Sequence, residues 1–284
     1  MPSEGFHVVA VRKSILSTFA GLGVRVARLP VMQGYLFNAM RLDRAETGGL
    51  VRDENLRFLG YCMARRDSSR AQILQDLWAC FELGEKTGGF FVEFGATNGL
   101  KNSNTWLLEK KLGWKGILAE PNPVWHADLL RNRDAFIETK CVSSKSGETV
   151  AFVTTDDTDP ELSGIEKFSD ADHFSETRSR GRRIELETIS LDDLLSKYDA
   201  PAVIDYMSID TEGSELEILS SYSFRHKFRT LSIENNRKNG RAVDEILVSK
   251  GYRRVFPQFS QWDSWYVSAE LRGSTPLAIV APEA

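Results

Sequence analysis

GGFFVEFGATNG, residues 88–99, is the stretch that decides the fold class of this 284-residue chain. Its apolar part, Phe90–Glu93, predicts a short buried strand, and the GATNG that follows predicts a glycine turn. Trp106, Leu107 and Leu108 then begin a helical pattern. A strand, a turn and a helix in this order form the first unit of an α/β sheet.

The same alternation continues through most of the remaining chain. Further strands are predicted at residues 116–119, 135–138, 203–209, 230–233, 252–256 and 265–267, and further helices at 125–132, 191–197, 215–221 and 243–250. This pattern predicts a parallel, doubly wound sheet with helices on both faces, closed by a hairpin of the last two strands. A polar, Asp-rich segment, Thr154–Gly181, interrupts the alternation, and such a segment is typically functional or mobile.

The distribution of these patterns divides the chain into three parts. Residues 1–67 are rich in Arg, lack the alternation and predict a helical N-terminal extension. Residues 68–271 form the predicted α/β domain, and residues 272–284 a weakly held C-terminal tail. Within the domain, the RSRGRR run at Arg178–Arg183 predicts a solvated loop, with binding of an anionic acceptor as the alternative.

The overall composition excludes several classes of protein. Hydrophobic residues make up 42% and charged residues 27%, as in ordinary globular domains. A net charge of −4 provides no general attraction to nucleic acid, so we expect no nucleic-acid partner. Three cysteines without a C-x-x-C pair fit a reducing, cytoplasmic location and no structural zinc site. No apolar run approaches the ~18 residues of a transmembrane segment.

Acidic residues after the first two predicted strands, where ligands bind in a doubly wound sheet, indicate a nucleoside site. Glu93, Gly95 and Gly99 follow the first strand. Glu120 follows the second, where an acid commonly accepts from both hydroxyls of a ribose. The turn lacks the G-x-G-x-x-G spacing of dinucleotide sites, and ribose recognition without a phosphate cradle predicts S-adenosylmethionine. Taken separately, the two elements have plainer alternatives, a simple glycine turn and a helix-capping glutamate.

Acidic side chains also crowd the ends of the fourth and fifth predicted strands. Asp210, Glu212 and Glu215 follow the fourth strand, and such crowding is unfavourable unless a proton or a cation relieves it. We therefore predict Asp210 or Glu212 as the catalytic base. Asp210, with Glu234 and Asn235 after the fifth strand, is also a candidate Mg²⁺ or Mn²⁺ site. The alternative for Glu212 and Glu215 is simple capping of a helix N-terminus.

Two longer runs resemble the FkbM-type methyltransferases, FFVEFGATNGLKNSNTWLLEKKLGWKGILAEPNP at residues 90–123 and IDYMSIDTEGSELEIL at residues 204–219. The resemblance covers about residues 70–270, and the D-x-E-G-x-E block is its most specific part. It implies a Rossmann-like class I methyltransferase fold with a mostly parallel, seven-stranded sheet. It also implies O-methylation of a hydroxyl on a sugar or natural product, with a saccharide or another small molecule as the acceptor.

The resemblance further implies a set of cofactor-binding residues. These are Glu93, Gly95, Ala96, Gly99, Glu120, Asn122 and Cys141. The first four belong to the loop at the methionine end, Glu120 is the ribose acid, and Cys141 is a small wall of the adenine pocket rather than a nucleophile. The alternative function is a methyltransferase-like binding or trafficking module without catalysis, against which the two cofactor acids argue.

Overall fold

The computed structural model describes residues 54–155, 160–169, 175–235 and 239–270. The chain divides into two compact units, residues 1–60 and 61–284, and of the first only the beginning of helix α4 (Glu54–Arg65) is described. The predicted tail, 272–284, and most of the predicted N-terminal extension, 1–67, lie outside the described residues. Within the described parts of the chain, no helix is both long and apolar enough to cross a membrane.

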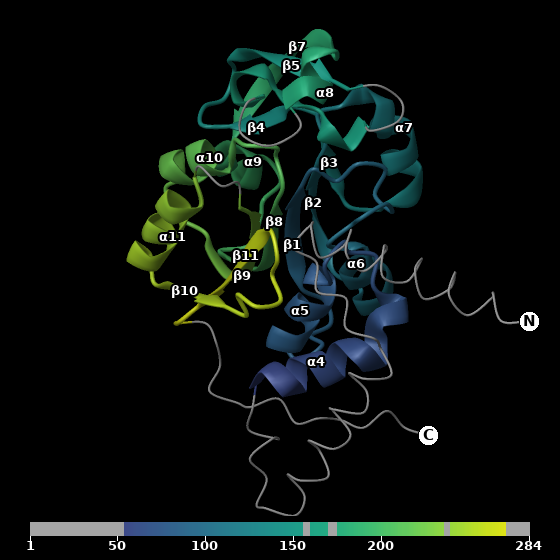
Figure 1. Cartoon of the computed structure of the whole chain (residues 1–284), viewed down its shortest axis with the longest axis vertical. Helices are drawn as coiled ribbons and strands as arrows, with labels where there is room; N and C mark the ends of the chain where they lie inside the picture. The colour runs from purple at the N-terminus through teal and green to yellow at the C-terminus, as the bar shows by residue number, and fades with distance from the viewer. Residues whose placement is uncertain (1–53, 156–159, 170–174, 236–238, 271–284) are drawn as a thin grey trace, which may run out of the picture. The chain divides into compact units, whose positions relative to one another are not determined.

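Seven strands form the main sheet, in the order β10-β11-β9-β8-β1-β2-β3 (Figure 1). They are β1 (Phe90–Phe94), β2 (Lys115–Ala119), β3 (Phe136–Glu138), β8 (Val203–Ile209), β9 (Lys227–Glu234), β10 (Tyr252–Val255) and β11 (Asp263–Ser268). β11 pairs antiparallel with β9 and β10, and the remaining pairs are parallel. This arrangement confirms the predicted Rossmann-like, mostly parallel sheet of seven strands, in which the chain order reverses next to β1.

Helices cover both faces of this sheet (Figure 1). They are α5 (Gln75–Glu82), α6 (Trp106–Leu112) and α7 (Pro123–Asn132) on one face, and α9 (Leu191–Lys197), α10 (Glu215–Ser221) and α11 (Gly240–Ser249) on the other. On the first face, Trp78 of α5 stacks on Trp265 of β11 with ring centroids 5.0 Å apart. On the second, Leu194, Ile218 and Leu247 join the apolar strand residues in the main core. The helices thereby leave the carboxyl ends of the strands to the loops.

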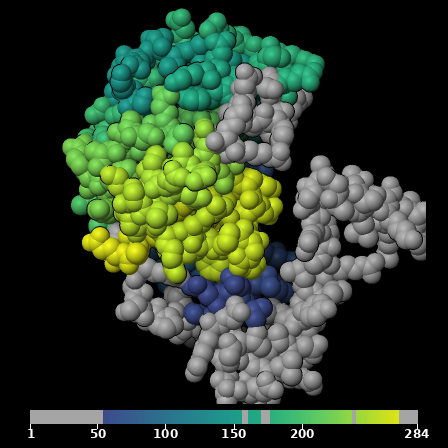
Figure 2. Space-filling view, turned by 60° about the vertical axis from the view of Figure 1, so that its left-hand side comes forward, coloured from purple at the N-terminus to yellow at the C-terminus, as the bar shows by residue number. Residues whose placement is uncertain are grey.

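A second, smaller sheet has the strand order β4-β7-β5-β6. Its strands are β4 (Cys141–Ser143), β5 (Thr149–Thr154), β6 (Gly164–Ile165) and β7 (Arg182–Ser190). Cys141, Phe152 and Ile165 form its small core. In Figure 2 the residues around this second sheet lie in the teal region at the top of the molecule, above the green and yellow residues of the later part of the chain.

The sequence patterns did not predict this second sheet. In its described part, the supposed insertion Thr154–Gly181 holds β6, the 3₁₀ turns η2 (Pro160–Leu162) and η3 (Glu166–Phe168), and helix α8 (Ser175–Ser179). β7 was missed because its sequence, RRIELETIS, mixes charged with apolar residues, and most of the strand is at least partly exposed. Exposed strands carry few of the apolar residues by which a buried strand is recognised.

Candidate active site

The turn after β1 lies where the order of the strands reverses, between the ends of β2 and β8. Gly95 has a φ of +76°, and a Cβ there would collide with the backbone oxygen of Asp210, which follows β8. The next residue, Ala96, is buried. Thr97 also has a positive φ, 46°, and its N–H donates to Glu120 Oε2 at 2.8 Å. The turn is therefore fixed on both sides at the place where ligands bind in doubly wound sheets.

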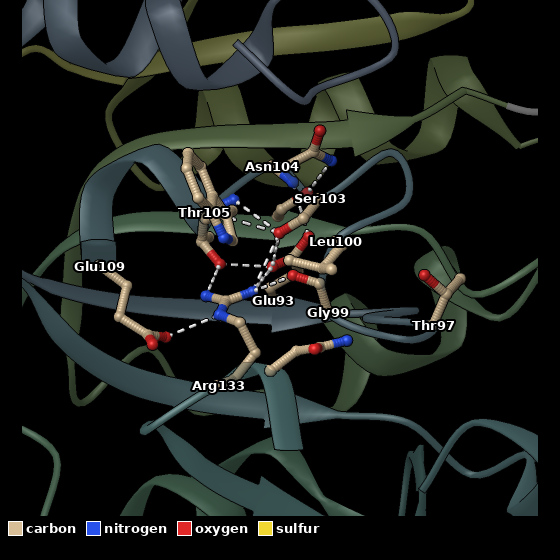
Figure 3. Close-up of polar contacts among 12 residues, drawn as sticks. Glu93, Thr97, Gly99, Leu100, Ser103, Asn104, Thr105, Glu109 and Arg133 are labelled. Carbon is tan, nitrogen blue, oxygen red and sulfur yellow. Dashed lines mark hydrogen bonds and ion pairs between the residues drawn. The ribbon is translucent and has the colours of Figure 1, made fainter. Parts of the chain in front are cut away.

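Glu93, in β1, is buried and bonds to the loop that precedes α6 (Figure 3). Its carboxylate accepts hydrogen bonds from Asn104 N at 2.7 Å, from Ser103 Oγ at 3.3 Å and from Thr105 Oγ1. Burial raises the pKa of Glu93, and the nearby Arg133 and these donors oppose that shift. Glu93 therefore holds the loop in place, and its predicted contact with a cofactor stays a prediction.

Arg133, which follows α7, completes this network with a side chain that is fully buried (Figure 3). Its Nε donates to Glu109 Oε2 at 2.7 Å, and its Nη2 donates to Thr105 Oγ1 at 2.8 Å. Its Nη1 donates to the Gly99 oxygen at 3.2 Å and lies 3.8 Å from Glu93 Oε2. A Cβ on Gly99 would lie 2.5 Å from the Arg133 side chain, so glycine at this position makes room for the arginine.

Glu120, which follows β2, is buried with both carboxylate oxygens accepting backbone hydrogen bonds. Oε2 accepts from Thr97 N and Oε1 from Asn122 N, each at 2.8 Å. A carboxylate oxygen has two lone pairs, so each oxygen keeps one for a further donor. Burial raises the pKa of Glu120 to about 7. The acid is thus placed and oriented by the turn, with acceptor capacity left over.

Two other predicted cofactor residues flank Glu120. The Asn122 side chain accepts from Val124 N at 3.2 Å, capping α7, and donates to Ser163 Oγ at 3.1 Å beside the second sheet. Cys141 is buried, and burial, with the charge of Glu120, raises the pKa of its thiol to about 12. A thiol with such a pKa is neutral and unreactive, in keeping with a pocket wall rather than a nucleophile.

The structure brings three acids together at the ends of β8 and β9. Asp210, Glu212 and Glu234 each place a carboxylate oxygen within 4.8 Å of the others. Burial, together with the charges of Asp263 and Glu215, raises the pKa of Asp210 to about 7. Burial and the charge of Asp210 also raise the pKa of Glu234. Asp210 and Glu234 are hydrogen-bonded to each other, so this pair holds a proton at neutral pH.

The two acids for which helix capping was the alternative differ in their contacts. Oε1 of Glu215 accepts from Thr211 N at 3.1 Å and from Gly213 N at 3.0 Å, so this residue shapes the turn before α10. Glu212 instead has a φ of 58° and pairs with Arg178, Nη2 to Oε2 at 2.5 Å. Glu215 therefore belongs to the turn before α10 and to the first turn of that helix, whereas Glu212 stays in the acid cluster.

Asn235, the predicted amide ligand, contacts Ser264 and Gly240, and its role as a metal ligand stays a prediction. Its Nδ2 donates to Ser264 Oγ at 3.1 Å, and its Oδ1 lies so close to Gly240 that a Cβ there would collide with it.

Sequence reasoning missed Asp263, which pairs with Glu234 in the β9–β11 register. Asp263 is buried, and burial raises its pKa to about 6. No local pattern marks this acid as buried, since its neighbour Trp262 is 43% exposed.

Sequence reasoning also missed Arg178, whose side chain is fully buried rather than solvated. Besides pairing with Glu212, it donates to the Leu162 oxygen at 2.8 Å and the Ser169 oxygen at 3.2 Å. Arg178 belongs to α8, so it ties the segment around the second sheet to the end of β8. No local signal distinguishes it from the other arginines of RSRGRR, because its burial depends on residues distant in sequence.

The comparison with protein-family models completes the assignment. The model described as "Methyltransferase FkbM domain" matches residues 93–264, which is more than half of the chain and includes every site residue described above. The chain belongs to the FkbM methyltransferase family. Membership confirms the predicted family and makes the chain a methyltransferase, with an S-adenosylmethionine site implied by that family.

Solved structures similar to this FkbM-family chain are also methyltransferases, at low identity. The "METTL16 MTase domain" has 14% identity and a TM-score of 0.36, and the match covers 68% of this chain and 64% of that one. Precorrin-6y C5,15-methyltransferase from Geobacter metallireducens GS-15 has 10% identity and a TM-score of 0.35, with 68% and 85% covered. The human methyltransferase 10 domain containing protein has 12% identity and a TM-score of 0.35, with 75% and 95% covered. A comparison with curated proteins gave no match.

The buried arginine network generates a prediction about stability. Arg133→Met should lower the free energy of unfolding by about 3–5 kcal/mol, because it leaves buried Glu93 without its cation and removes one of the two cations that pair with Glu109. The matched control is Arg131→Met in the last turn of α7, two residues before Arg133, because the Arg131 side chain is 70% exposed and its loss should cost less than about 0.5 kcal/mol. Urea unfolding measures both values. Equal losses in the two variants would contradict the role assigned to Arg133.

The acid cluster generates a prediction about pH. The folded chain raises the pKa of Asp210 to about 7, so it binds a proton that the unfolded chain, with a pKa near ~3.9, releases. The free energy of unfolding should therefore fall as the pH rises from about 4 to about 7. Urea unfolding should show a shallower fall for Asp210→Asn. Asp134→Asn is the control, since Lys110 lowers the pKa of that exposed acid and it does not titrate in this range. Parallel curves for wild type and Asp210→Asn would rule out the proton assigned to this cluster.

Proposed function

We propose that the chain is an S-adenosylmethionine-dependent O-methyltransferase that acts on a hydroxyl of a saccharide or another small natural-product acceptor. The observation that carries this proposal is the Asp210–Glu234 carboxyl pair, with a pKa of about 7 at Asp210, directly beside the turn after β1. A carboxyl group that exchanges its proton near neutral pH is suited to general base catalysis on a hydroxyl.

The residues around Glu120 fit the cofactor. Each oxygen of this buried carboxylate has a lone pair to spare, and the two oxygens suit the two hydroxyls of a ribose. Gly95, Ala96 and Gly99 would shape the loop near the methionine end, and Asn122 and Cys141 would line the pocket beyond Glu120. Bound S-adenosylmethionine would supply a methyl group carried on a positively charged sulfur.

Asp210 is the proposed base, with Glu212 as a supporting charge. Arg178 already pairs with Glu212 at 2.5 Å, which leaves Asp210 as the proposed proton acceptor. Asp210 would take the acceptor's proton, and Glu234, hydrogen-bonded to it, would share the charge. Most of the rate would come from holding the hydroxyl in line for transfer.

A divalent cation is the second candidate for activating the hydroxyl. Carboxylate oxygens are the ligands that Mg²⁺ and Mn²⁺ prefer, and the cluster of Asp210, Glu212 and Glu234 fits such an ion. In this site Glu212 would join Asp210 and Glu234, and Asn235, whose Nδ2 is held by Ser264, would offer its side-chain oxygen as the predicted amide ligand.

The setting of the site favours a neutral or cationic acceptor. Several carboxylates at one edge of the sheet would repel phosphates, and with a net charge of −4 this argues against nucleic acid as the acceptor. The described cysteines, Cys62, Cys80 and Cys141, are free and buried, which suits a cytoplasmic location.

Calorimetry with S-adenosylhomocysteine tests the proposed cofactor. The wild type should bind one equivalent, and Glu120→Gln should bind at least about tenfold more weakly, because it loses charge-assisted hydrogen bonds to the ribose. Glu138→Gln is the matched control, since Glu138 is the buried acid at the end of the next strand, β3, and bonds to Thr139 N at 3.0 Å. Equal loss in both variants would place the ribose elsewhere, and no binding by the wild type would favour the non-catalytic module.

Methyl transfer from labelled cofactor to a panel of hydroxyl acceptors tests the proposed base. Asp210→Asn should lower turnover at least ~10²-fold, the scale of a positioned acid–base group, while Asp134→Asn leaves it unchanged. Activity should persist after exhaustive EDTA treatment. Activity that EDTA abolishes and Mg²⁺ or Mn²⁺ restores would replace the carboxylate base with the metal site.

A further inference from the structure

We propose that Asn104 binds the amino-acid end of the cofactor, accepting a hydrogen bond from its α-ammonium group on the side-chain oxygen Oδ1. This inference rests on the proposed use of S-adenosylmethionine. It adds a residue from the loop before α6 to the site, beyond the glycine turn and the ribose acid.

The Asn104 side chain has one polar atom without a partner. The residue is 7% exposed, and its Oδ1 is buried with no hydrogen bond to any residue that the structure describes. Buried polar atoms in folded proteins are almost always paired, so an unpaired one calls for an explanation. A ligand that donates a hydrogen bond at this position supplies one.

The position of this oxygen is fixed by the rest of the residue. The backbone N–H of Asn104 donates to Glu93 Oε1 at 2.7 Å, and Nδ2 donates to Ser208 Oγ at 2.9 Å. Its neighbours Ser103 and Thr105 also donate to the Glu93 carboxylate. Figure 3 shows the Asn104 oxygen directed away from the Glu93 and Arg133 network. The acceptor is therefore preorganised without being consumed by the network that holds it.

The location of Asn104 separates it from the ribose acid. Glu120 lies on the β2 side of β1, whereas Asn104 bonds to Ser208 on β8, the neighbour of β1 on the other side. A cofactor whose ribose is held by Glu120 would cross the end of β1 with its amino-acid part toward β8. Ser208 lies two residues before Asp210, so this part would approach the acid cluster.

The charge around Asn104 favours a cationic donor. Glu93, to which its backbone N–H bonds, also raises the pKa of Asp210, so both acids act on the same region. Carboxylates lower the electrostatic potential around the amide oxygen and favour an ammonium over a neutral donor. After the ribose hydroxyls are assigned to Glu120, the α-ammonium is the cationic N–H donor that remains on the cofactor.

Two ligands and two variants test the inference. S-adenosylhomocysteine carries the amino-acid end, and 5′-methylthioadenosine lacks it. By calorimetry, Asn104→Leu should bind S-adenosylhomocysteine at least about tenfold more weakly and 5′-methylthioadenosine with less than about a twofold change. Asn104→Asp keeps an acceptor oxygen and should retain the wild-type preference for S-adenosylhomocysteine. If Asn104→Leu does not fold, as judged by thermal unfolding, Asn104→Asp alone decides through that preference.

The outcomes that overturn the inference differ from those that overturn the function. Equal weakening of both ligands by Asn104→Leu, no weakening of either, or loss of the preference in Asn104→Asp would exclude the contact while leaving the methyltransferase intact. Failure of the wild type to bind either ligand would refute the proposed function itself, and the inference with it.

Discussion

A carboxylate buried in the central strand must find its partners inside the protein, and Glu93 imposes this constraint on the whole site. Removing an ion from water costs several kcal/mol unless hydrogen bonds and a counter-charge replace the solvent. Donors come from the loop at 103–105, and the counter-charge comes from Arg133. Because the loop and α7 must both reach β1, the glycine turn between them is confined, and the lack of a side chain at Gly99 leaves room for the arginine.

The acid cluster at the ends of β8 and β9 differs from Glu93, because its buried acids lie next to other acids. Asp210 and Glu234 lie beside Asp263, and burial with the charges of these neighbouring acids raises the pKa values of both. Glu212 has a cation, Arg178, whereas Asp210 shares its hydrogen with Glu234. Glu93 in β1 is therefore a buried acid whose hydrogen bonds and counter-charge make this part of the site rigid. At the end of β8, by contrast, Asp210 has a pKa of about 7, which is close to neutrality as a proton acceptor requires.

The second sheet connects these two regions to the rest of the domain. After β2, Asn122 donates a hydrogen bond to Ser163, which precedes β6. After β8, Glu212 pairs with Arg178 of α8. Both contacts bring the segment around the second sheet to the loops at the carboxyl ends of the main sheet. Residues from the middle of the chain thus take part in shaping a site whose chemistry lies on β1, β2, β8 and β9.

By itself the sequence determined the seven-stranded α/β fold, the turn at 95–99 and the acids at the strand ends. These signals are local, since apolar strands, glycines and helix caps act over a few neighbouring residues. Only the tertiary structure decided which charged residues are buried and which partners they pair with. Asp263 accepts a hydrogen bond from Gln75, which lies 188 positions away in the sequence. Arg178 can be buried because Glu212 and two backbone carbonyl groups bind its guanidinium group. The energy of a buried charge depends on partners that folding brings together, so no local pattern reveals it.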